Sequence, residues 1–131
     1  MVIISEVCKA LAKHEIIGLG EATHGSYKNS VMRFKIIKLL IEKYSIREVV
    51  IEDDVKIINK IMLDDGAHLQ QIMPYLMHPW DNKIMEEMLL YIINWNRNNP
   101  DDKVRVYGVD IIKQGAVPFK DKISASLNKS Y

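Results

Sequence analysis

Three short apolar runs, each ending in an acidic residue, alternate with helical segments and constrain the fold more than any other feature of the chain. The runs are 15–21 (EIIGLGE), 47–53 (REVVIED) and 104–110 (VRVYGVD). Apolar residues recur at helical spacing in the segments 29–44, 55–63 and 82–98. Strands that alternate with helices are typical of a parallel sheet with helical crossovers. The sequence therefore predicts a three-layer α/β fold around a mostly parallel sheet.

Length and charge narrow the class of protein. The 131 residues fit a single domain, 1–131, whose last part, 112–131, is weakly patterned and predicted to be a tail. Eighteen basic and 17 acidic side chains give a net charge of +1, so we expect neither nucleic acid nor a membrane as partner. No window reaches the roughly 18 apolar residues of a spanning helix. With Cys8 as the single cysteine, a soluble, reducing, cytoplasmic location is expected.

The segment from Gly18 to Ser26 (GLGEATHGS) is the richest in chemical groups. Its glycines allow a tight turn and a close approach to a ligand. Glu21 and His24 lie between them, and a carboxylate near a neutral imidazole orients it and makes it a better base. Because parallel sheets bind ligands beyond the carboxyl ends of their strands, the acids at those ends are further candidates, namely Glu52 or Asp53, and Asp110.

Several familiar site types do not fit this segment. Position 23 is threonine, so the dinucleotide-binding fingerprint is incomplete, and no Lys-Ser or Lys-Thr follows to make a P-loop. The other histidines lack metal-ligand spacing to His24, and no nucleophile-elbow serine is present. We therefore predict no metal and no cofactor, and a base that activates water. A phosphate- or sugar-handling enzyme is a further alternative, which the missing lysine disfavours.

Arg33 is a second indication of a polar site. It lies four residues before Ile37 and seven before Leu40, so it shares a helix face with residues that pack inward. A cation in the first turns of a helix also opposes the macrodipole. An acidic partner would offset this cost, and the sequence predicts a network of His24, Glu21, Arg33 and Glu52.

At these residues the sequence resembles the erythromycin esterase family. The resemblance rests on G-x-G-E-x-x-H-G-[ST] at Gly18 to Ser26, the arginine at Arg33, and the strand that ends at Glu52. It continues with the tryptophan-bearing helix end 95–99 (WNRNN) and the G-x-D of 108–110, and covers roughly residues 15–110.

The resemblance implies metal-independent hydrolysis of an ester, in the best-known members a macrolactone of macrolide antibiotics. The histidine matching His24 is then the general base on water, and the residues matching Glu21, Glu52 and Arg33 position the base, the water and the ester. Gly25, Ser26, Trp80 and Asp110 are the candidate substrate contacts. For Trp80 the alternative is core packing, and for Asp110 a structural turn.

Family members are longer and supply further histidines from their C-terminal half, whereas the last histidine here is His78. The sequence thus indicates a truncated version of a larger fold, represented by its N-terminal portion. The partner expected for an active enzyme is a small-molecule ester. The alternative is a catalytically incomplete relic or binding module that self-associates or meets a second chain supplying the missing half.

Overall fold

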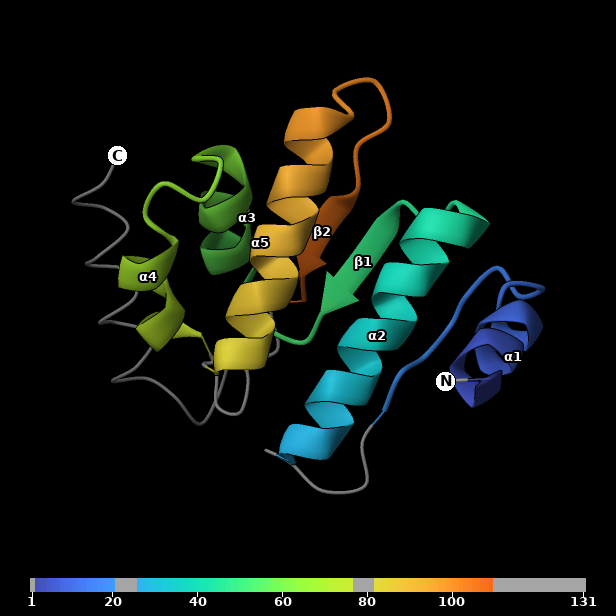
Figure 1. Ribbon diagram of the computed structural model, residues 1–131. Coiled ribbons are helices and arrows are strands. Elements are labelled where there is room, and N and C mark those ends of the chain that lie inside the picture. Colours follow the sequence, from blue (N-terminus) through green and yellow to red (C-terminus); the bar gives the residue numbers. More distant parts are fainter. Residues whose placement is uncertain (1, 21–25, 77–81, 110–131) are drawn as a thin grey trace.

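The computed structural model describes residues 2–20, 26–76 and 82–109 (Figure 1). The predicted tail, 112–131, lies outside this part of the chain. The elements follow one another as α1 (Val2–Leu11), α2 (Tyr27–Tyr44), β1 (Glu48–Ile51), α3 (Val55–Leu63), α4 (Leu69–Ile72), the 3-10 helix η1 (Met73–Tyr75), α5 (Lys83–Asn98) and β2 (Arg105–Gly108). No described helix is long and apolar enough to cross a membrane.

The two strands lie side by side and run parallel, and the chain between them is helical, which confirms the α/β prediction. Their register pairs Glu48 with Arg105 and Ile51 with Gly108. Backbone hydrogen bonds extend the ladder beyond both ends. The Arg105 N–H donates to the carbonyl of Arg47 at 2.8 Å, and the Val109 N–H donates to that of Ile51 at 3.1 Å.

Only one face of this two-stranded sheet is covered by the described residues. Val49, Ile51 and Val106 turn toward the helices and join the core. On the opposite face Val50 is 62% exposed and Tyr107 is 39% exposed. Figure 1 shows α2 and α5 on the same side of the strands. The described part is therefore a two-layer unit, and a third layer is not seen in it.

The first predicted strand is not formed in the described residues. Residues 16–20 have no regular secondary structure, although the prediction placed a strand at 15–21. No backbone hydrogen bond joins 16–20 to another described segment. Gly18 and Gly20 explain part of the difference, because glycine loses more conformational entropy in a strand and contributes no side chain to packing.

The helices begin where short polar side chains can cap them. Ser26 Oγ accepts from the Asn29 N–H at 3.4 Å before α2. Asp54 accepts from the Lys56 N–H at 2.7 Å before α3, so the capping acid is Asp54 rather than Asp53. Asn82 caps α5 at 2.9 Å. Such caps satisfy N–H groups that have no partner inside the helix.

Helical periodicity placed the core correctly. Of the apolar residues at helical spacing in 82–98, Met85, Met88, Leu89 and Ile92 are buried on α5, and Trp95 is partly buried. These side chains pack in one core with residues of α2, α3, the strands and the residue before β2. The most deeply buried of these are Ile41, Ile57, Ile58, Ile61 and Val104. Cys8 on α1 is fully buried.

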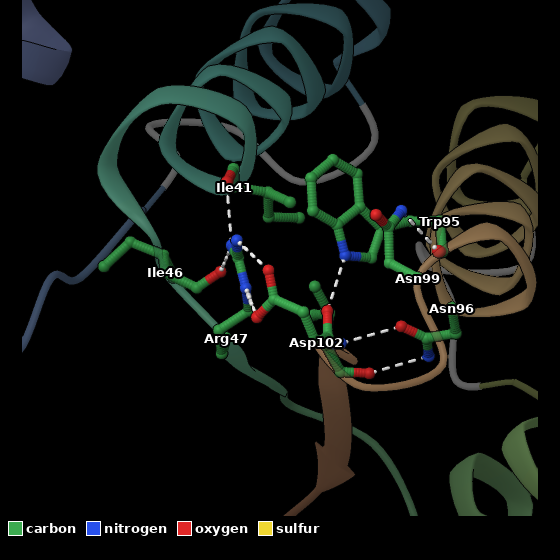
Figure 2. Close-up of polar contacts among 8 residues, drawn as sticks. Ile41, Ile46, Arg47, Trp95, Asn96, Asn99 and Asp102 are labelled. Atoms are coloured by element: carbon green, nitrogen blue, oxygen red, sulfur yellow. Dashed lines mark hydrogen bonds and ion pairs between the residues drawn. The ribbon is translucent and has the colours of Figure 1, made fainter.

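A polar cluster fixes the amino-terminal ends of both strands (Figure 2). Arg47 Nε and Nη2 donate to the two carboxylate oxygens of Asp102 at 2.8 and 2.9 Å. The same guanidinium donates to the carbonyl of Ile41 at 2.7 Å and lies 5.0 Å from the centre of the Trp95 ring. Trp95 Nε1 donates to the carbonyl of Asp102 at 2.9 Å. This cluster joins the end of α2, the end of α5 and the loop before β2.

Candidate functional site

A groove of about 460 Å³ runs along the edge of β1 that faces away from β2. Residues 15–20 form one of its walls, β1 forms another, and α2 and α5 close it. In Figure 1 the blue trace that forms the first wall leaves the end of α1 and descends beside α2. The aliphatic side chains that line it are Ile17, Leu19, Ile37, Leu40, Ile46, Val49, Val50, Ile51, Met85 and Met88. A volume of this size is within the range of pockets for small organic ligands, about 300–1,000 Å³.

Arg33 enters this groove from α2. It is partly buried and lines the same wall as Ile37 and Leu40. The sequence argument placed Arg33 on the inward face of its helix, and the structure confirms that placement. Its guanidinium is thus a hydrogen-bond donor set at the border of an otherwise aliphatic wall.

Glu52 reaches the groove from the carboxyl end of β1. It follows Ile51 directly, is exposed, and lines the groove together with Arg33. The next residue, Asp53, was the alternative strand-end acid. Asp53 is instead fully buried, and its Oδ1 accepts from the Asp54 N–H at 2.7 Å. Of these neighbouring acids, Glu52 is therefore the one that meets the groove.

Of the other predicted site residues, the structure describes only Ser26. Its hydroxyl caps α2, and the residue does not line the groove. The role that the structure shows for Ser26 is therefore structural. Glu21, His24, Gly25, Trp80 and Asp110 lie outside the described residues. Of the predicted network, the described residues include Arg33 and Glu52, which line one groove.

Among the groove residues that were not assigned to the site from sequence, four carry a carboxylate or a sulfur atom. Glu15 and Glu48 line the groove near the amino-terminal ends of their segments, and Glu48 also pairs with Arg105 across the sheet. Met85 and Met88 are core residues, 7% and 4% exposed, and they line the groove as well. The alternation in EIIGLG is a signal that would have placed one face of 15–20 against the site.

The lone thiol is not an activated nucleophile. Burial raises the pKa of Cys8, because desolvation disfavours the thiolate. Its Sγ lies 3.8 Å from the carbonyl oxygen of Ile36 on α2, where it acts as a weak donor. Within the described ranges, no group of three or more His, Cys, Asp or Glu side chains is arranged to hold a metal ion.

Comparisons with protein families, with curated proteins and with solved structures found no match to this chain.

Proposed function

We propose that the chain is an esterase-like hydrolase domain that binds a small-molecule ester in the groove along β1. The single observation that carries this proposal is that Arg33 and Glu52, chosen from sequence on separate elements, line one groove with aliphatic walls. Aliphatic walls suit the body of an organic ester, and the two charged groups suit its polar centre. The resemblance of Gly18 to Ser26 to erythromycin esterases supports the same assignment.

In the proposed reaction His24 accepts a proton from water, and the resulting hydroxide attacks the ester carbonyl carbon. The tetrahedral intermediate collapses, the carbon–oxygen bond to the leaving group breaks, and the imidazolium returns the proton to the departing alkoxide. Glu21 orients the imidazole. Arg33 donates hydrogen bonds where negative charge develops, and Glu52 holds the water or the guanidinium in place. The reaction needs no metal and no cofactor.

The exposed face of the sheet supports the proposal that the unit belongs to a larger, three-layer fold. Parallel strands occur almost only in sheets that are covered on both faces. Here Val50 and Tyr107 are exposed on one face of a parallel pair. A further layer over that face would complete the architecture predicted from sequence. We propose the cytoplasm as the site of action on the ground of cysteine content.

The test is ester hydrolysis by the purified chain, with simple esters and macrolides as substrates. We expect His24→Ala and Glu52→Gln to lower kcat/KM by about 10²-fold or more, within the range of general acid–base contributions. Glu87→Gln is the matched control, because Glu87 is an exposed glutamate of α5 that does not line the groove. Equal activity of the parent chain, His24→Ala and Glu52→Gln, all with native circular dichroism, would refute the assignment.

The second candidate is a binding module that retains the fold without catalysis. The observation that favours it is the sheet face that the described residues leave uncovered, which a second copy or another chain would cover. In that case the chain would bind apolar esters in the groove with unchanged affinity in His24→Ala and would hydrolyse none of them. Hydrolysis that depends on His24 excludes this candidate.

A further inference from the structure

The edge of β1 that borders the groove carries backbone groups that β2 does not use. In a parallel ladder, the backbone N–H and C=O groups of alternate residues point to the same neighbouring strand. The carbonyls of Arg47 and Ile51 accept hydrogen bonds from β2. Glu48 and Val50 therefore turn their backbone groups to the opposite edge, where they border the groove. Within the described ranges no backbone hydrogen bond reaches Val50 from that side.

Residues 16–20, on the far wall of the groove, have the side-chain pattern of a strand. Ile16 is 90% exposed, Ile17 and Leu19 are partly buried and line the groove, and Gly18 and Gly20 are exposed. The same alternation holds in β1, where Val49 and Ile51 turn inward and Val50 outward. Residues that alternate in this way line the two faces of a sheet. The segment thus already presents the correct face to the helices.

Chain order gives this segment the direction that pairing requires. Residues 16–20 precede the 18-residue helix α2, which is followed by β1. A strand, a crossover helix and a second strand form a unit in which the two strands are parallel neighbours. The position beside β1 is open in the described structure, and the segment lies across a groove from it.

We propose that residues 16–20 dock onto the free edge of β1 as a third, parallel strand and thereby close the groove. Paired strands lie about 4.8 Å apart, so the docked segment leaves no room for a cavity of 460 Å³ between them. The described structure is the open form, which admits a ligand, and the docked form excludes it. Ligand binding and strand docking therefore compete for the same edge.

Amide hydrogen exchange of the full chain, followed by NMR, tests this proposal without a substrate. Docking gives the Val50 N–H an acceptor, so we expect its exchange to be at least tenfold slower than that of an unbonded amide. The double variant Ile17→Asn with Leu19→Asn places polar groups on the face that docking buries, and Val50 protection should be lost. Ile16→Asn, the same change on the exposed side, should retain it. The Val49 N–H points toward β2 and reports that the rest of the sheet is intact in each variant.

Nuclear Overhauser contacts between the backbones of 16–20 and 48–52 provide the second measurement, and we expect them in the parent chain. Exchange of the Val50 amide at the unbonded rate, with Val49 protected, would overturn the proposal. Protection that increases with protein concentration would also overturn it, because a strand of a second copy would then occupy the edge. Neither readout depends on hydrolysis, so a failure here is distinct from a failure of the proposed function.

Discussion

Asn96 is the residue whose replacement we expect to destabilise the fold most clearly. Its side-chain amide closes two hydrogen bonds with the backbone of Val104: Nδ2 donates to the carbonyl at 2.8 Å, and Oδ1 accepts from the N–H at 2.7 Å (Figure 2). Val104 is 1% exposed and directly precedes β2. These two bonds fix the entry of the second strand against the end of α5.

Asn96→Ala removes both partners and leaves the backbone groups of Val104 in the protein interior. A buried polar group without a partner costs about 1–3 kcal/mol. Because the carbonyl is easier to satisfy than the N–H, and water reaches part of the half-buried site, we expect a total loss of roughly 2–4 kcal/mol in the free energy of unfolding. For a domain of this size each kcal/mol lowers Tm by about 3–4 °C, so Tm should fall by roughly 6–16 °C.

Urea unfolding monitored by circular dichroism measures the loss directly. Asn94→Ala is the control, since Asn94 is an exposed asparagine of the same helix whose Oδ1 accepts a 3.2 Å hydrogen bond from Arg97. We expect Asn94→Ala to change the free energy of unfolding by less than about 0.5 kcal/mol. An Asn96→Ala protein as stable as Asn94→Ala would show that the two bonds to Val104 do not hold the strand entry, and the reasoning above would be refuted.

Two further predictions concern the ends of the strands. Gly108→Ala should cost about 1–3 kcal/mol in unfolding free energy, because its Cβ would lie 2.7 Å from the carbonyl oxygen of Asp54, a backbone atom that cannot turn away; the control Gly20→Ala, with nothing within 4 Å of its Cβ, should be neutral in chemical denaturation. The second prediction concerns pH. Hydrogen bonds from Arg47 hold the pKa of Asp102 below its usual value, so the stabilisation is present above the unfolded pKa of about 3.9 and is lost as pH falls through the folded value. The difference in unfolding free energy between the parent chain and Asp102→Asn should therefore shrink on acidification, and a difference that grows would contradict the ion-pair explanation.

Helical periodicity predicted more of this fold than any other signal. The helices expected at 29–44, 55–63 and 82–98 are present as α2, α3 and α5, within two residues of the predicted ends. Two of the three expected strands are present, and the parallel pairing that follows from helical connections is confirmed. Periodicity succeeds here because each helix buries one stripe of side chains, which only one helical phase can provide.

The missing strand shows the limit of a local signal. The apolar alternation of 16–20 is present in the structure, yet the backbone pairing that defines a strand is not found among the described residues. Side-chain burial depends on the segment itself, whereas strand pairing depends on the position of a neighbour. The alternation therefore predicts which face of the segment turns inward. It does not predict whether the segment pairs with the edge of β1.

For the candidate site, the sequence predicted where two of the described residues lie. The phase of α2 placed Arg33, and the rule that ligands lie beyond strand ends placed Glu52. The groove itself could not be predicted, because it depends on the spacing between elements, which no single segment encodes. Its lining includes Glu15, Glu48 and the two methionines. The catalytic and substrate-binding roles of all the predicted site residues stay predictions.

The polar residues that flank β1 differ between its two ends. At the amino end, Arg47 makes four hydrogen bonds, to Asp102 and to the carbonyls of Ile41 and Ile46. At the carboxyl end, Glu52 is exposed at the groove. A strand held firmly at one end keeps its register, and this helps to set the position of Glu52 at the groove. Substitutions at Asn96 should accordingly lower the free energy of unfolding while leaving ligand affinity in the groove unchanged below the transition. Substitutions at Glu52 should change that affinity.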